Sequence, residues 1–122
     1  MIGYTTLGTN DLDRAAAYYD KLLAELGAKR TWNLPRFIAW GRKPDAPALA
    51  VCRPFDGNPA TVGNGVMVAL ACKSREQVDR LHALALSLGG TDEGAPGDRG
   101  GGFYAGYFRD LDGNKLNFFA MG

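Results

Sequence analysis

The sequence has few of the residues that build metal and nucleophile sites. Its 122 residues include two cysteines, with no CxxC spacing, and one histidine. Cys52 and Cys72 each lie in an apolar run, so we expect two buried thiols rather than a disulfide or a zinc site. His82 lies beside the apolar stripe of a predicted helix. We expect it to be a partly exposed helix residue rather than part of a catalytic triad.

Charge excess and long apolar runs are also lacking. Fourteen Lys and Arg residues face thirteen Asp and Glu residues, and the basic residues are scattered along the chain. This pattern excludes the basic footprint of a nucleic-acid partner. The apolar runs fall short of the ~18 residues of a membrane span, and no basic segment with an apolar core opens the sequence. We therefore expect a single cytoplasmic domain over residues 1–122, with no membrane partner.

The first half of the chain has the pattern of a βαβββ unit. From Leu12 onward apolar residues recur at helical spacing, between a capping segment at residues 9–11 and Gly27. Strand-like runs precede and follow this predicted helix, at about residues 2–8, 28–33, 36–41 and 48–53. One amphipathic helix and four strands are therefore predicted.

The second half repeats this order. A strand at residues 66–72 precedes a cap at Lys73 and Ser74, a helix that Gly89 and Gly90 close, and a short strand at about residues 91–95. Tyr4 aligns with Met67 and Asp11 with Ser74 at one offset (67 − 4 = 74 − 11 = 63). Such an offset indicates an internal repeat. We predict an α+β fold of two βαβββ modules forming a curled mixed β-sheet cup with the helices outside. Module 1 spans about 1–56, the connector about 54–63 and module 2 about 64–122.

A hairpin at residues 107–119 closes the sequence. The segment from Asp110 to Asn114 is typical of a tight turn, and its Gly comes too early for a calcium loop. Pairing across the turn brings Tyr107 opposite Asn117. Because side chains alternate along a strand, Leu116 and Phe118 face the helix while Asn117 faces the other side.

These motifs resemble the vicinal oxygen chelate superfamily, which includes glyoxalase I, bleomycin-resistance proteins and extradiol dioxygenases. The resemblance rests on four segments, of which the last is the most specific: residues 2–14, 53–57, 63–65 and 109–115. It implies two modules that enclose a cavity, paired within one chain or exchanged in a homodimer. It also implies, in many members, a divalent metal held by His or Gln from each first strand and by Glu from the last strands.

The metal positions of the superfamily carry unsuitable residues in this chain. By the resemblance they fall on Tyr4, Met67 and Asn117, with either Ala50 or Cys52 as the fourth. A phenol, a thioether and a carboxamide are poor ligands for a divalent ion that prefers imidazole, thiolate or carboxylate. We therefore expect no metal and no other cofactor.

We predict that the cavity binds a small organic molecule through aromatic and polar side chains. The candidate ligand-binding residues are Tyr4, Thr6, Trp32, Trp40, Met67, Arg99, Tyr107 and Asn117. Arg99 lies in a Gly-rich loop at residues 97–102 that is a candidate lid, where it would meet an anionic ligand.

Three functions stay open at this point. The preferred one is a metal-free, glyoxalase/bleomycin-resistance-like binding protein, whose catalytic residues, if any, are unknown. An alternative is a metal-dependent lyase or dioxygenase of glyoxalase type that uses displaced ligands such as Cys52, Glu93 or Asp98. The third is a structural or interaction protein whose cavity its own side chains fill.

Overall fold

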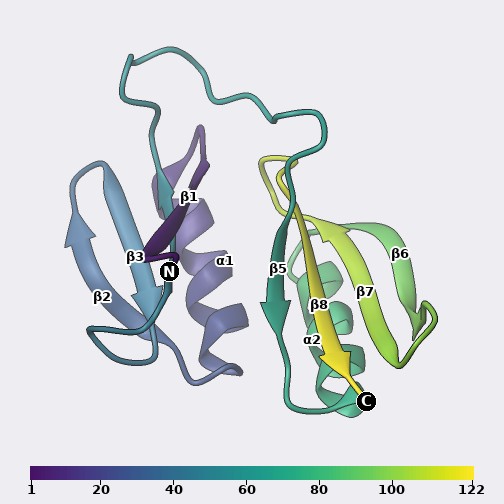
Figure 1. Cartoon of the computed structure of the whole chain (residues 1–122). Coiled ribbons are helices and arrows are strands. Elements are labelled where there is room, and N and C mark those ends of the chain that lie inside the picture. Colours follow the sequence, from purple (N-terminus) through teal and green to yellow (C-terminus); the bar gives the residue numbers. More distant parts are fainter. The chain divides into compact units, whose positions relative to one another are not determined.

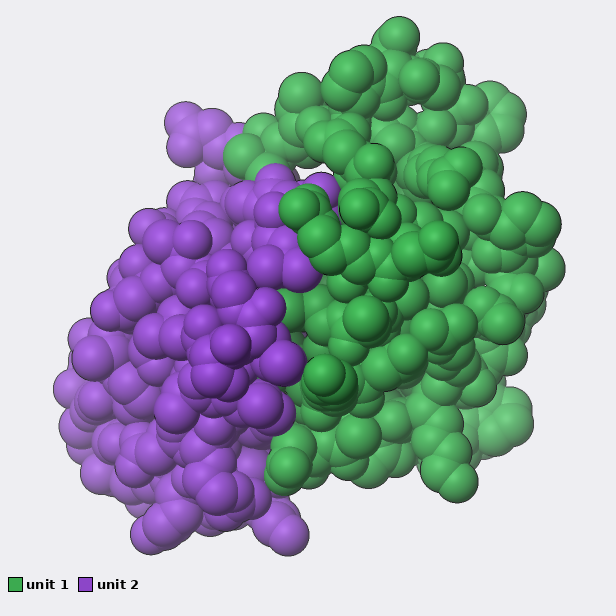
Figure 2. All heavy atoms as spheres, turned by 180° about the vertical axis from the view of Figure 1, so that it is seen from behind, with its two compact units in different colours: residues 1–62 green, residues 63–122 purple.

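The computed structural model describes all residues, 1–122. Its contacts divide the chain into two compact units, Met1–Val62 and Gly63–Gly122, which are coloured separately in Figure 2. The first unit contains β1 (Tyr4–Gly8), α1 (Leu12–Ala24), β2 (Lys29–Leu34), β3 (Phe37–Gly41) and β4 (Ala48–Cys52). The second contains β5 (Val68–Ala71), α2 (Arg75–Ser87), β6 (Thr91–Asp98), β7 (Phe103–Arg109) and β8 (Lys115–Met121).

Each unit is one open, four-stranded mixed sheet with one helix (Figure 1). The strand order is β1-β4-β3-β2 in the first unit and β5-β8-β7-β6 in the second. In each, the first strand pairs with the last in parallel, and the other neighbours are antiparallel. The predicted α+β fold of two βαβββ modules is confirmed.

The internal repeat is most regular at the helices. Asp11 caps α1 by accepting a hydrogen bond from the Arg14 backbone N–H, and Ser74 caps α2 by accepting one from Gln77. The helices start 63 residues apart and end 63 residues apart (75 − 12 = 87 − 24 = 63). The predicted offset is therefore confirmed.

Each helix covers one face of its own sheet. The ring of Trp40 on β3 packs on Tyr19 of α1, with ring centroids 5.7 Å apart, and its indole N–H donates to Asp20. In the second unit Phe108 and Phe118 stack at 5.1 Å, and both are fully buried. Burial of such large side chains supplies most of the stabilising free energy of each unit.

The closing turn holds its shape through one carboxylate. Asp110 Oδ1 accepts hydrogen bonds from the backbone N–H groups of Asp112 and Asn114, and Asp110 Oδ2 accepts one from the Asn114 amide. Gly113 has a φ of 87°, which suits glycine, whereas no other residue type in the chain has a positive φ. The predicted turn is confirmed, and the register pairs Tyr107 with Asn117 as expected.

Several predicted boundaries need correction. Strand β6 continues through the start of the predicted glycine-rich loop to Asp98, with register irregularities at Gly94 and Gly97 against β7. Strand β5 begins at Val68, so Met67 precedes it. The cysteines are half-buried rather than buried, and neither forms a disulfide. Neither helix has the length and apolar character needed to cross a membrane.

Candidate ligand-binding faces

The side of each sheet that faces away from its helix is called its open face here. Because Trp40 faces α1, alternation along β3 turns Phe37 and Ala39 to the first open face. Tyr4 and Thr6 of β1 and Ala48 and Ala50 of β4 lie on this side too, by register. Trp32 of β2 is paired with Ala39. This first open face is rich in aromatic rings and in residues with small side chains.

A pocket of about 510 Å³ lies on the first open face. Four lining residues have small side chains that leave room for a ligand: Gly3, Ala39, Ala46 and Ala48. Its aromatic lining is Tyr4, Trp32 and Phe37. The Phe37 ring lies 5.9 Å from the Tyr4 ring at 90° and 6.1 Å from the Trp32 ring at 65°. These edge-to-face contacts fix the rings relative to one another and give the pocket an apolar lining.

Polar groups are few in this pocket. Thr31 donates a hydrogen bond from its hydroxyl to the Ala39 carbonyl. Asp45 stands in the loop between β3 and β4, and the Lys43 ammonium lies 3.8 Å from its carboxylate. Tyr4 and Trp32 remain 64% and 61% exposed. The pocket therefore combines accessible aromatic surface with one carboxylate.

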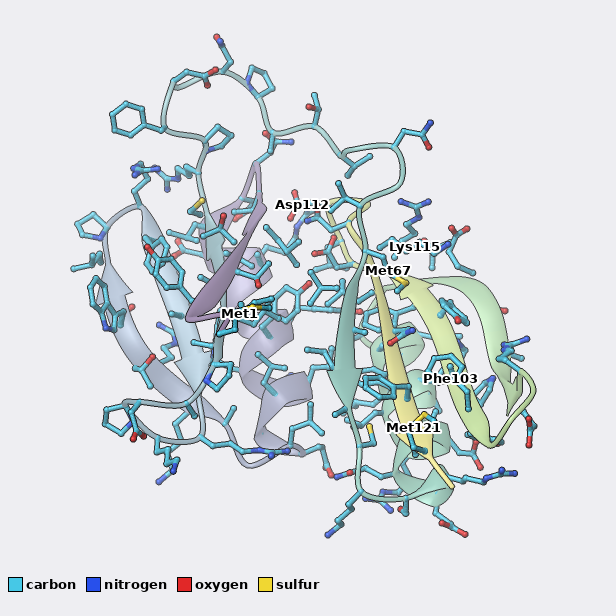
Figure 3. All side chains as sticks on the ribbon, in the orientation of Figure 1. Met1, Met67, Phe103, Asp112, Lys115 and Met121 are labelled. Carbon is cyan, nitrogen blue, oxygen red and sulfur yellow. The ribbon has the colours of Figure 1, made fainter.

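The second open face has a different chemistry. Alternation places Tyr107, Lys115 and Asn117 on the side of the sheet away from α2, because Gly106 lies against His82 of α2. The Arg99 guanidinium and the Lys115 ammonium lie 5.4 Å and 5.5 Å from the Tyr107 ring centroid. Figure 3 labels Lys115 at the start of β8 and Met121 at its end. The chain's own cations thus occupy this aromatic surface.

Asn117 is the most unusual polar residue of the second open face. It is 1% exposed, and its side-chain Oδ1 is buried with no hydrogen-bond partner. Neighbouring strands place Ala69 and Tyr107 beside it. A buried acceptor without a donor costs about 1–3 kcal/mol, so Asn117 either lowers stability or meets a donor from outside the chain.

The predicted ligand-binding residues do not form one site. They lie on the first open face, on the second open face, or, for Met67 and Trp40, on neither. Tyr4 and Trp32 line the pocket, and Thr6 shares its face. Arg99, Tyr107 and Asn117 belong to the second open face, and Met67 is 40% exposed before β5. From the sequence, Arg99 is expected to be available to an anionic ligand. Its guanidinium instead donates hydrogen bonds to the Ala95 and Ala105 carbonyls.

Trp40 is the candidate that needs correction. Its side chain is 2% exposed on the helix side of the sheet, so it does not reach the open face. Sequence reasoning left out Phe37 and Asp45, which line the pocket. The alternation from Trp40 could have indicated Phe37, three residues earlier and therefore on the opposite side.

His82 is also placed differently from the prediction. It is 5% exposed, and its Nε2 lies 3.2 Å from Asp92 Oδ1 and 3.1 Å from the Tyr107 carbonyl. Since a carbonyl only accepts, Nε2 carries the hydrogen. Gly106 makes room for the ring, because a Cβ there would lie 3.1 Å from His82 Cδ2. His82 therefore joins α2 to the sheet, buried rather than partly exposed.

Ionisable groups with a shifted pKa lie away from the pocket. The Arg30 guanidinium, bonded to Asp20 at 2.8 Å and 2.9 Å, lowers the pKa of Asp20 and has its own pKa raised. In the second unit the Gly100 N–H and Arg75 lower the pKa of Asp98. The Asp79 carboxylate raises the pKa of Tyr104. All these groups are partners in structural contacts.

The sheet register settles which residue matches Asn117 in the first unit. Asn117 pairs with Ala69, whose counterpart at the offset of 63 is Thr6, and Thr6 pairs with Ala50. The positions that the resemblance implies for a metal then correspond to Tyr4 and Ala50 in one unit and to Met67 and Asn117 in the other. No group of three or more His, Cys, Asp or Glu side chains is placed to hold a metal ion. This donor set does not fit a divalent metal.

Two βαβββ units in one chain are typical of a known class of protein, and comparison with known families identifies it. The family model of the Glyoxalase/Bleomycin resistance protein/Dioxygenase superfamily matches residues 1–118, so the chain belongs to this superfamily. A crystal structure of a glyoxalase/bleomycin resistance protein from Albidiferax ferrireducens T118 is 35% identical, with a TM-score of 0.91. The match covers 100% of this chain and 99% of that one.

Two more distant structures share the fold. Lactoylglutathione lyase from Agrobacterium tumefaciens is 21% identical with a TM-score of 0.72, over 98% of this chain and 92% of that one. A glyoxalase-related enzyme from Fulvimarina pelagi is 20% identical with a TM-score of 0.77, over 98% and 87% of the two chains. No curated protein matches the sequence significantly.

Proposed function

We propose that this member of the superfamily binds a small organic molecule with aromatic or apolar surface, in the pocket of the first open face, without a metal. One observation carries the proposal: the 510 Å³ pocket with an accessible aromatic lining. Small-molecule sites are typically concave, mostly apolar and about 300–1,000 Å³ in volume, with few polar groups to orient the ligand. The Tyr4 hydroxyl is a candidate for that role, and the Thr31 hydroxyl, which donates to the Ala39 carbonyl, could serve only as an acceptor.

The absence of suitable ligands supports the metal-free part of the proposal. Tyr4, Ala50, Met67 and Asn117 offer no imidazole, thiolate or carboxylate at the superfamily's positions. Of the displaced acids considered, Glu93 is engaged by Arg109 at 2.9 Å and Asp98 by Arg75 at 3.1 Å. No contact in the structure favours the metalloenzyme alternative. The homodimer stays a prediction.

Two measurements on the same preparation test the proposal. Purified without chelator, the protein should contain far less than one equivalent of Zn, Ni, Mn or Fe per chain. In thermal unfolding, 4-tert-butylphenol should raise the melting temperature with concentration, because a ligand that binds the folded state stabilises it by RT ln(1 + [L]/Kd). A full equivalent of bound metal would contradict the metal-free part. No shift with any of a panel of small aromatic compounds would contradict the binding function.

A further inference from the structure

The charge of the pocket on the first open face indicates the class of its ligand. Among the residues that line it, Asp45 is the only one with a charged side chain. A backbone hydrogen bond from Ala46 to the Lys43 carbonyl closes a turn around Asp45, and Pro44 and Pro47 flank it. Proline fixes φ, so the turn holds the backbone of Asp45 at the rim, and the side chain projects from there into solvent.

The aromatic lining adds to this negative potential. The face of an aromatic ring is the negative end of its quadrupole, and it attracts a cation that lies within about 6 Å of the centroid. Tyr4, Trp32 and Phe37 meet at steep angles, so they present faces and edges in several directions around the pocket. None of these three rings has an Arg or Lys of the chain over it, since the cation–π contacts lie elsewhere.

The second open face provides a contrast within the same protein. Its Tyr107 ring already has Arg99 and Lys115 over it, at 5.4 Å and 5.5 Å. A cationic ligand would meet two like charges there. The first open face instead offers three rings and a carboxylate, whose one near cation is the exposed Lys43 at 3.8 Å. An exposed pair of this kind contributes little, so a ligand cation can compete with Lys43.

We infer that the pocket of the first open face selects organic cations: flat or compact molecules that carry a quaternary or alkylated ammonium group. The ammonium group lies against the Tyr4, Trp32 and Phe37 rings, and the Asp45 carboxylate supplies the long-range attraction. This inference rests on the proposed function, because it assumes that the pocket is a ligand site.

A matched pair of ligands separates the two claims. (4-Hydroxyphenyl)trimethylammonium and 4-tert-butylphenol have nearly the same shape and differ by one positive charge. We expect calorimetric titration of the full chain to give an affinity roughly 5- to 30-fold higher for the cation, the range that a partly desolvated cation–π site supports. Raising the salt concentration should reduce this ratio, since the Debye length is ~10 Å at 0.1 M and shortens further.

Three variants assign the effect to named groups. Asp45→Asn keeps the shape of the side chain and should weaken binding of the cation several-fold more than binding of 4-tert-butylphenol, so the preference for the cation falls. Lys43→Gln removes the competing ammonium and should increase the preference. Asp13→Asn makes the same charge change in the first turn of α1, outside the pocket lining, and should have little effect.

Each outcome decides between the two claims. Equal affinity for the two ligands in the wild-type protein, or the same preference in Asp45→Asn, would overturn the cation inference while the binding function stands. Binding of neither ligand would overturn both. Tighter binding of the neutral phenol than of the cation would also overturn the cation inference, because it would show that the pocket disfavours a positive charge. Circular dichroism of every variant establishes that it is folded before its affinity is compared.

Discussion

The two units have the same scaffold and different open faces. Their helices match at an offset of 63, and both sheets pair the first strand with the last in parallel. On the first open face aromatic rings and alanines leave a pocket, whereas on the second Arg99 and Lys115 cover Tyr107 and Asn117 is buried. The difference shows that packing against the helix determines the fold, while a few outward residues determine the chemistry of each face.

The largest expected effect is a difference in stability between substitutions on the two sides of the first sheet. Trp40→Ala should lower the free energy of unfolding by about 3–5 kcal/mol, because it removes a buried ring that packs on Tyr19. Trp32→Ala should change it by only about 0.5 kcal/mol, since Trp32 is 61% exposed. Urea unfolding of both variants measures this. Comparable losses would contradict the assignment of Trp32 to an open pocket.

Filling the pocket tests the difference between the two open faces. Ala48→Phe should weaken binding of 4-tert-butylphenol at least about tenfold, equivalent to ~1.4 kcal/mol, because the new ring occupies ligand space. Ala46→Trp, in the loop at the rim, is a second filling variant that leaves the strands untouched. The matched control is Ala71→Phe on β5, an exposed alanine of the second unit. Equal affinity in all three variants would contradict the placement of the site.

The buried amide of the second open face gives a smaller effect of opposite sign. Asn117→Leu should raise the free energy of unfolding by about 1 kcal/mol, because it removes an acceptor that is buried without a donor. Asn114→Ala is the control, since that amide is bonded to Asp110 and its loss should destabilise the turn. If Asn117→Leu destabilised the protein as Asn114→Ala does, Asn117 would have a partner within the chain.

The smallest expected effect is on the loss of stability at acid pH. Folding lowers the pKa of Asp20 below its usual 3.8, chiefly through the Arg30 hydrogen bond. The folded state therefore binds this proton less tightly than the unfolded chain. The resulting stabilisation is present above pH 3.8 and is lost as the pH falls through the lower, folded-state pKa.

Asp20→Asn should accordingly lose less stability than the wild type between about pH 7 and pH 3. Asp98→Asn makes the same comparison in the second unit. The pKa of Asp98 is also lowered, through the Gly100 N–H and Arg75, so this variant should change the acid response in the same direction. Urea unfolding at the two pH values measures both. A steeper acid loss in Asp20→Asn than in the wild type would contradict the role of the Arg30 contact.

The sequence was sufficient for the fold because local signals agreed with each other. Asp11 and Ser74 precede apolar helical stripes, and the Asp110–Asn114 turn fixes the register that pairs Tyr107 with Asn117. Helical spacing alone could not show that Gly106 makes room for His82, because that contact joins residues 24 positions apart (106 − 82 = 24). The burial of His82 therefore required the tertiary structure.

The candidate site was predicted only in part, for a similar reason. Aromatic residues near strands were recognisable, but their faces depend on register, and Trp40 lies on the helix side while Phe37 lies in the pocket. The irregular pairing in β2 between Arg30 and Trp32 hides the alternation there. Asp45 comes from a loop, where no periodicity indicates which way a side chain points.

The two tryptophans allow the most direct test of the central claim, that the first open face holds the ligand site. In a two-dimensional ¹H–¹⁵N spectrum each gives one indole N–H signal, which Trp32→Phe assigns. During titration with 4-tert-butylphenol, the Trp32 signal should shift progressively to saturation. The Trp40 signal should stay in place, because its N–H is bonded to Asp20 on the helix side. Saturable binding that leaves the Trp32 signal unmoved would contradict the account.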